Sequence, residues 1–157
     1  MKKTIVCFVI LCMTTFALSA QEISENSIGI RFGDNSGLGG EVSYQLKLKE
    51  SNRLEINLGT RSDSKVSSFK LTGIYQWVWD IDNGFNWYAG FGGGVGSWKN
   101  KVVDQSEAVL YAAGNIGIEY NFEIPLLISL DYRPEFGFSD IYDGLNSDFA
   151  LSLRYQF

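Results

Sequence analysis

Apolar and polar residues alternate with a period of two through almost all of the chain after Gln21. The last nine residues, FALSLRYQF at 149–157, show this pattern in its simplest form. Successive side chains of a β-strand point to opposite faces, so the alternation gives each strand one apolar and one polar face. We find no convincing helical spacing of apolar residues after Gln21. The sequence therefore predicts an all-β protein.

Eight such segments follow one another, with turn-forming residues between them. They cover residues 28–32, 42–46, 54–58, 69–79, 85–95, 110–122, 126–132 and 149–157. The connections after the second, fourth and sixth segments are short, and we expect those after the fifth (98–107) and the seventh (139–147) to be the longest. Pro134 lacks the N–H of a central strand residue and predicts a bulge or a strand end. Eight strands of about 10 residues leave no room for a second domain.

The N-terminus has the features of a secretory signal peptide. Lys2 and Lys3 precede an apolar run over residues 5–18, and small residues follow just before Gln21. The run is too short for a transmembrane helix, which needs roughly 20 apolar residues. We therefore expect residues 1–20 to be cleaved and residues 21–157 to form the mature domain. Cleavage would also remove the two cysteines, Cys7 and Cys12.

Composition excludes several classes of function. The formal net charge is −5, whereas a nucleic-acid-binding protein needs a basic surface. The chain has no histidine, the commonest general base and metal ligand, so we expect no enzymatic activity and no cofactor.

The glycine-rich segment 90–96 lies within a strand pattern and does not open a helix, as a dinucleotide site would require. We expect these glycines to relieve crowding and to permit sharp coiling of the strand.

Alternation alone fits either a soluble barrel with an apolar core or a membrane barrel with an apolar exterior. Two features favour the membrane barrel. Large aromatic residues gather at the strand ends beside the short turns, where they would form a girdle at a lipid interface. The predicted girdle consists of Trp77, Trp79, Trp87, Tyr120 and Tyr155. The final strand also runs to the last residue, Phe157, without a polar tail.

The ending at 149–157 resembles the C-terminal signature of Gram-negative outer-membrane β-barrels. From about residue 27 onward, the chain resembles the small eight-stranded barrels of the OmpA/OmpX type. This resemblance implies an antiparallel, up-and-down transmembrane barrel in the outer membrane, in contact with lipid and with both termini in the periplasm. It also implies that Tyr155 and Phe157 form a signal for the barrel assembly machinery.

The resemblance implies a structural or surface-interaction role, and the sequence does not identify a surface partner. Two other interpretations stay open. One is a soluble periplasmic β-barrel that binds a hydrophobic ligand, and the other is a narrow outer-membrane channel. Detergent dependence would distinguish the first alternative, and conductance in a planar bilayer would distinguish the second.

Charged residues on the polar faces would meet inside such a barrel. An eight-stranded barrel is only just wide enough for side chains, so charges inside it must be paired or hydrated. The predicted lumen network consists of Glu55, Arg61, Lys70, Glu119, Asp131, Arg133, Glu135 and Arg154. We expect this network to fill and tie the barrel, and the alternative is a gate or a proton path. The apolar Ile74, Val78 and Leu127 also fall at inward positions and depart from the inward polar pattern.

Overall fold

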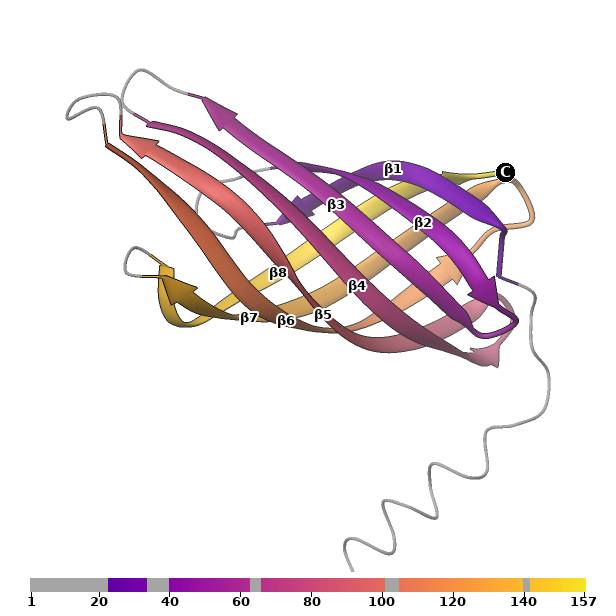
Figure 1. The fold of residues 1–157 in the computed structure, drawn as a ribbon. Helices are drawn as coiled ribbons and strands as arrows, with labels where there is room; N and C mark the ends of the chain where they lie inside the picture. Colours follow the sequence, from indigo (N-terminus) through magenta and orange to yellow (C-terminus); the bar gives the residue numbers. More distant parts are fainter. Residues whose placement is uncertain (1–22, 34–39, 63–65, 101–104, 140–141) are drawn as a thin grey trace, which may run out of the picture.

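The computed structural model describes residues 23–33, 40–62, 66–100, 105–139 and 142–157. Eight antiparallel strands close into one barrel, in which each strand pairs with the next along the chain (Figure 1). The strands are β1 (Asn26–Gly33), β2 (Glu41–Lys49), β3 (Asn52–Ser62), β4 (Val66–Asp82), β5 (Phe85–Asn100), β6 (Gln105–Asn121), β7 (Leu126–Ser139) and β8 (Tyr142–Gln156). β8 pairs with β1 and completes the ring, for example where Tyr155 lies opposite Ile28. The prediction of an eight-stranded up-and-down barrel is confirmed.

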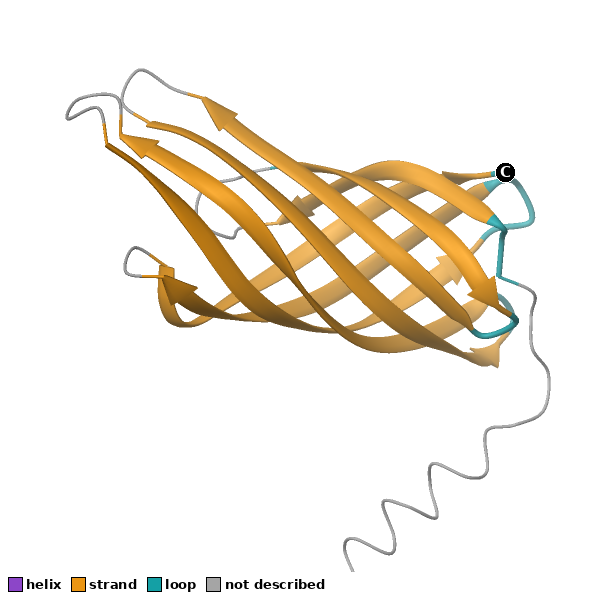
Figure 2. Cartoon of the chain, viewed as in Figure 1, coloured by secondary structure: helices purple, strands orange, loops and turns teal. Residues whose placement is uncertain are grey.

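Almost all of the described chain is strand, drawn in orange in Figure 2, and its described loops and turns are drawn in teal. Within the described ranges, no helix is long and apolar enough to cross a membrane. The predicted signal peptide, residues 1–20, lies outside the described residues, so its removal stays a prediction.

The two ends of the barrel differ in their connections. At one end, called the turn end below, residues 50–51, 83–84 and 122–125 join consecutive strands, and the C-terminus lies at this end (Figure 1). Asn83 and Gly84 have φ angles of 50° and 89°, the left-handed conformation that a two-residue hairpin turn requires. The opposite end, called the loop end, carries the connections 34–40, 63–65, 101–104 and 140–141. The predicted short turns are confirmed.

The expectation that residues 98–107 and 139–147 form the longest connections is wrong. β6 already begins at Gln105 and β8 at Tyr142, so the longest connection is 34–40, between β1 and β2. The backbone ladders of β5 with β6 and of β7 with β8 continue through most of both segments. Main-chain hydrogen bonds satisfy the backbone whatever the side chains are, so the polar residues in these segments do not end the strands.

Pro134 does not end β7, contrary to the expectation from its missing N–H. β7 continues to Ser139, and Pro134 lies opposite Ser147 of β8. On the other side of β7, the pairing with β6 passes directly from Tyr132 to Glu135. The strand accommodates the proline through a short gap in one ladder, and the register is the same on both sides of this gap.

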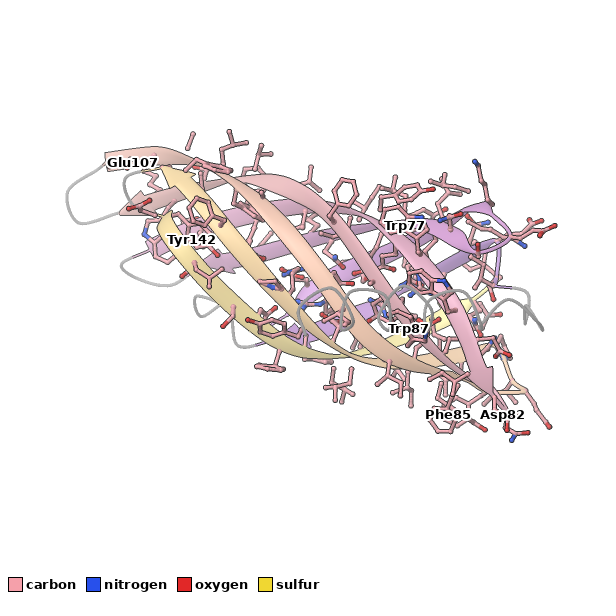
Figure 3. All side chains as sticks on the ribbon, turned by 90° about the horizontal axis from the view of Figure 1, so that it is seen from below. Trp77, Asp82, Phe85, Trp87, Glu107 and Tyr142 are labelled. Atoms are coloured by element: carbon pink, nitrogen blue, oxygen red, sulfur yellow. The ribbon has the colours of Figure 1, made fainter. Side chains whose placement is uncertain are left out.

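Apolar side chains point outward and polar side chains point inward. In β8, the outward Leu151, Leu153 and Tyr155 are 54%, 44% and 57% exposed, whereas Ser152 and Arg154 are fully buried. Figure 3 shows the side chains on the outside of the wall and within it. The packed interior of this molecule is therefore polar, and its exterior is apolar.

Three inward positions are apolar, as the sequence indicates. Ile74 packs with Tyr111 in the middle of the barrel, and Val78 packs with Tyr88 nearer the turn end. Leu127 is also buried. Ile74 and Leu127 pair with both neighbouring strands and Val78 pairs with Tyr88 of β5, all without a slip at these positions, so the apolar residues do not mark an error of register.

Glycines on inward positions make room for two large rings. A Cβ at Gly117 would overlap the ring of Tyr88, and a Cβ at Gly94 would overlap the ring of Tyr111. Each tyrosine lies directly opposite its glycine in the ladder between β5 and β6. These contacts fit the expectation that glycines in segment 90–96 relieve crowding in a narrow lumen.

Candidate functional site: the charged lumen

The lumen is filled with charged side chains that the alternation of each strand turns inward. Among the side chains that the structure describes, six carboxylates and five cationic groups are buried there. They are Glu41, Glu55, Glu119, Asp131, Glu135 and Asp148, and Arg31, Arg53, Lys70, Arg133 and Arg154. Each lies within ion-pair distance of an opposite charge, which offsets the cost of removing both groups from water.

Nearest the turn end, Arg53 of β3 binds Glu119 of β6 across the lumen. Both terminal nitrogens of Arg53 take part, at 3.0 and 2.7 Å from the two carboxylate oxygens. Its Nε donates to Oε1 of Gln76 at 2.6 Å, and the guanidinium lies 4.9 Å from the centroid of the Tyr88 ring. This bidentate pair is the geometry in which arginine binds a carboxylate most strongly.

Further into the lumen, Arg154 of β8 reaches Glu55 of β3 at 3.1 Å. Arg154 also donates to the hydroxyl groups of Ser43 and Ser129, at 3.0 and 2.7 Å. Glu55 accepts hydrogen bonds from the amides of Gln45, Asn57 and Gln76. The buried carboxylate and guanidinium are thus surrounded by neutral donors and acceptors as well as by each other.

Arg31 of β1 binds three carboxylates. Its side chain lies 2.6 Å from Oδ1 of Asp131, 3.2 Å from Oε2 of Glu41 and 2.5 Å from Oδ2 of Asp148. Arg133 of β7 shares two of these carboxylates, at 2.7 Å from Glu41 and 3.5 Å from Asp148. Two guanidinium groups therefore hold three carboxylates from β2, β7 and β8.

Toward the loop end, Lys70 of β4 binds Glu135 of β7, and the hydroxyl group of Tyr142 donates to the same carboxylate oxygen at 2.6 Å. The ammonium group of Lys70 lies 4.7 Å from the Tyr111 ring centroid and 5.4 Å from that of Tyr142. Arg133 forms a second ion pair with Glu135 at 2.9 Å. Ion pairs thus follow one another along the barrel from the turn end to the loop end.

The structure places seven of the eight predicted lumen residues inside the barrel, and all seven take part in ion pairs. The side chain of the eighth, Arg61, lies outside the described residues, although its backbone belongs to β3. Among the expected partners, Glu55 with Arg154 and Glu135 with Lys70 are brought together. Among the described side chains, Glu119 binds Arg53 and Asp131 binds Arg31, and neither of these cations was predicted.

Arg31, Arg53 and Asp148 belong to the network but are absent from the predicted set. Arg31 could have been found because it lies between the outward Ile30 and Phe32, and Arg53 because it precedes the outward Leu54 and lies two residues before the inward Glu55. Asp148 immediately precedes the predicted strand 149–157, so its inward position follows only once β8 is known to begin at Tyr142. Glu41 could likewise have been found from its place beside the outward Val42.

The lumen geometry offers little for catalysis or metal binding. The buried carboxylates are engaged by arginine, lysine or amide groups. Within the part of the chain that the structure describes, no group of three or more acidic or cysteine side chains is arranged to hold a metal ion. The arrangement can bridge strands that are far apart in the wall, because most of these ion pairs join strands that are not neighbours in the ring.

We expect Arg154→Ala to lower the free energy of unfolding by roughly 1–3 kcal/mol. The substitution leaves the buried Glu55 carboxylate without its nearest cation, and amide donors alone replace only part of that interaction. Urea unfolding in micelles measures the effect, with Lys49→Ala on an exposed position as the control. Equal midpoints for Arg154→Ala and the parent would mean that water in the lumen solvates Glu55.

The predicted girdle residues lie on the outside of the wall beside the turn end. Trp79 and Trp87 stack with ring centroids 4.3 Å apart, and the ring centroids of Tyr120 and Phe85 are 4.6 Å apart. Trp77, Trp87 and Phe85 lie toward one end in Figure 3, and Tyr142 lies toward the other. Outward aromatic rings thus gather at the turn end as a band.

The predicted C-terminal signal residues complete the ring of strands. Tyr155 and Phe157 point outward, with 57% and 61% of their surfaces exposed. The backbone of Phe157 exchanges two hydrogen bonds with Asn26, at 2.9 and 3.1 Å. The last residue of the chain therefore pairs with the first residue of β1, at the point where the barrel closes.

Comparison with known proteins supports the fold. No protein-family model and no curated protein matches the chain. The solved N-terminal β-barrel domain of OprF from Pseudomonas aeruginosa is similar, with a TM-score of 0.67 and 15% identity over 86% of this chain and 100% of that one. Neisserial surface protein A has a TM-score of 0.59 and 12% identity, over 84% of this chain and 94% of that one.

A third similar structure is Ail, the attachment invasion locus protein of Yersinia pestis, with a TM-score of 0.56 and 16% identity over 85% of this chain and 97% of that one. Ail is an outer-membrane protein. At these identities the likeness establishes a shared fold. The predicted resemblance to small eight-stranded outer-membrane barrels is thereby confirmed at the level of the fold.

Proposed function

We propose that this chain is an integral outer-membrane protein of a Gram-negative bacterium. In this proposal the turn end and both termini face the periplasm, and the loop end faces the cell surface. The role is structural or surface-interactive, through the barrel and its loop-end connections. Neither a cofactor nor a catalytic activity is part of the proposal, because the chain lacks histidine and its buried acids are engaged in ion pairs.

The observation that carries this proposal is that apolar side chains face outward and charged side chains face inward, the reverse of a water-soluble protein. Outward Phe91, Leu145 and Phe149 are 64%, 72% and 67% exposed, whereas the inward arginines are buried. Apolar area in contact with water costs about 25 cal/mol per Å², so a surface of this kind is unfavourable in water and favourable in lipid. A closed barrel also pairs its backbone groups between strands, which is what a hydrocarbon environment demands.

Membrane fractionation with a heat-modifiability gel tests the proposal. The protein should be found with the outer membrane and should be extracted only by detergent. The folded barrel should migrate faster than the boiled sample, because it resists SDS until it is heated. Recovery in the soluble periplasmic fraction, with a single gel position before and after boiling, would contradict the proposal.

The two alternative functions receive less support from the lumen. A soluble barrel that binds a hydrophobic ligand needs an apolar cavity, but the side chains that fill this lumen are mainly charged and polar. A channel needs an open path, but ion pairs cross the lumen from near the turn end to the loop end. We expect no measurable conductance in planar bilayers, and steady channel openings would favour the narrow channel instead.

We expect Trp77, Trp79 and Trp87 to be quenched by lipids brominated near the headgroup. All three lie on the outside beside the turn end, where a lipid interface would cross the barrel. Reconstituted protein and fluorescence quenching provide the measurement, and lipids brominated deep in the acyl chains serve as the comparison. Stronger quenching by the deep bromines would place these rings in the bilayer core and would contradict the girdle.

Export and assembly complete the proposal. Residues 1–20 act as a signal peptide, and the intact mass of the envelope protein should correspond to a start at or within one residue of Gln21. Retention of Met1 would contradict cleavage.

The outward Tyr155 and Phe157 are proposed to be read by the barrel assembly machinery, so Phe157→Ala should slow assembly in cells yet still give a barrel that folds in detergent.

A further inference from the structure

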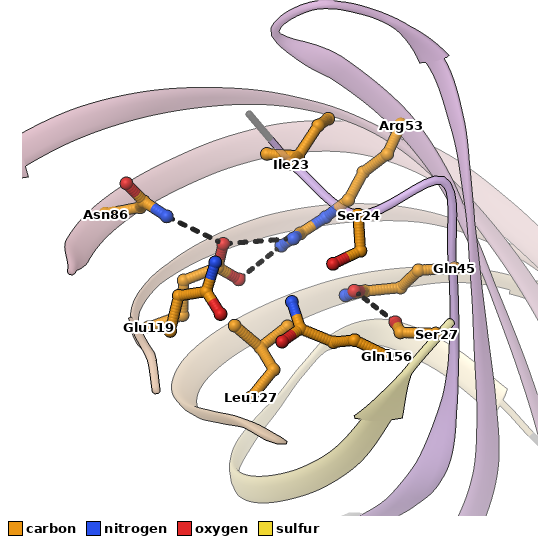
Figure 4. Close-up of a pocket in the computed structure, with 10 residues that line it drawn as sticks. Ile23, Ser24, Ser27, Gln45, Arg53, Asn86, Glu119, Leu127 and Gln156 are labelled. Atoms are coloured by element: carbon orange, nitrogen blue, oxygen red, sulfur yellow. Dashed lines mark hydrogen bonds and ion pairs between the residues drawn. The ribbon is translucent and has the colours of Figure 1, made fainter. Parts of the chain in front are cut away.

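The short segment before β1 enters the barrel instead of continuing along its wall. The chain bends at Glu25, and Ile23 lies in the turn-end mouth of the lumen with only 7% of its surface exposed (Figure 4). The backbone carbonyl of Glu25 accepts a hydrogen bond from the N–H of Lys47, at 2.8 Å. Asn26 is fixed on its other side by its two bonds to Phe157. The bend is therefore held by both neighbouring strands, and it directs Ile23 inward.

Ile23 meets apolar residues at inward positions, where the other strands mostly carry polar groups. It packs with Val78 and Tyr88 in one buried cluster, and Leu127 lines the same mouth. Val78 and Leu127 are two of the three apolar residues that break the inward polar pattern. An apolar side chain in a polar lumen contributes little by itself, so their position beneath Ile23 gives these exceptions a physical reason.

Directly behind this cluster lies the bidentate pair of Arg53 and Glu119. Both residues line the small remaining cavity, together with Ile23 and Ser27 (Figure 4). The cavity has a volume of about 10 Å³, which is close to the smallest space that holds one water molecule. Among the described residues, Ile23 therefore lies at the mouth of the cavity that the ion pair lines.

We infer that Ile23 is a stopper that closes the turn-end mouth of the lumen and keeps water and ions from the Arg53–Glu119 pair. In the mature chain that begins at Gln21, the stopper would be the third residue. Its position near a free chain end means that the seal could be withdrawn without unfolding any strand. The free chain end rests on the proposed cleavage before Gln21, whereas the closure of the mouth by Ile23 does not depend on the physiological role proposed above.

Cysteine accessibility tests the stopper. Both native cysteines precede residue 23, so Ser27→Cys is a single reporter within the described chain, and Ser27 is buried beside the cavity. A charged, water-soluble methanethiosulfonate reagent is added to the folded protein in micelles, and modification is read at position 27 by peptide mass spectrometry. With Ile23 present the reporter should react slowly. Ile23→Ser should accelerate the reaction roughly tenfold, because burial of an isoleucine side chain favours the closed mouth over the open one by about that ratio.

Three controls make the result specific. Ile23→Val keeps an apolar stopper and should leave the reaction slow, and Ile23→Ala should give an intermediate rate. Ser68→Cys, buried near the loop end, should react at the same rate with and without Ile23→Ser. Gel mobility before boiling shows that each variant is folded. An unchanged rate at position 27 would overturn the inference, and so would equal acceleration at positions 27 and 68, which would indicate a general loosening of the barrel.

Discussion

Arg31→Met is expected to lower the free energy of unfolding by about 3–5 kcal/mol, the cost of breaking a buried ion pair. Methionine keeps most of the length and apolar contact of the arginine stem but removes its charge. The variant leaves Asp131 without its bidentate partner, and it removes from Glu41 and Asp148 one of the two guanidinium groups that they share. Three carboxylates around one guanidinium would repel one another inside a narrow lumen.

Urea unfolding in micelles, followed by tryptophan fluorescence, measures this loss. Lys49→Ala removes a positive charge from an exposed position of β2 and should change the midpoint little. Adding Asp131→Asn to Arg31→Met removes one of the stranded charges, so the double variant should be less destabilised than the sum of the single variants. Additive losses would mean that Arg31 and Asp131 do not act together, in conflict with their 2.6 Å contact.

The alternation of the sequence predicts which residues point inward, but it does not predict which of them meet. Arg31 of β1 binds Asp131 of β7, and Arg53 of β3 binds Glu119 of β6. These strands are not neighbours in the ring, so their contacts depend on the tilt of the strands and on the diameter of the barrel. Neither quantity can be read from a period of two. The inward face was therefore predictable, whereas the pairs within it were not.

Strand ends were the least predictable part of the fold. Residues around Gly144 have the composition of a turn, yet Gly144 lies in β8 opposite Gly137. Turn propensity is a local property, whereas the ladder there is stabilised by the neighbouring strand and by cross-strand contacts. Asp148 shows the consequence, because its role in the network follows only from the correct extent of β8. The short turn at Asn83 and Gly84 was predictable, since its chemistry and its conformation agree.

Gly92→Ala is expected to destabilise the barrel by roughly 2–4 kcal/mol, although it adds a single methyl group. A Cβ at Gly92 would overlap the carbonyl oxygen of Gly73 on the neighbouring strand β4. That oxygen belongs to the backbone, so it cannot move aside as a flexible side chain would. Relief of the overlap would require β4 and β5 to move apart, at a place where Ile74 lies opposite Gly92 and continues the ladder.

Gly73→Ala provides the matched control on the other strand of the same pair. A Cβ at Gly73 would meet nothing within 4 Å, so this variant should stay within about 0.5 kcal/mol of the parent. Both substitutions exchange glycine for alanine in the middle of a long strand, and they therefore change the entropy of the unfolded chain to a similar extent. The difference between their urea midpoints isolates the close approach of β4 to β5. Equal midpoints would contradict that approach, and with it the view that inward glycines on β5 allow the wall to coil around a filled lumen.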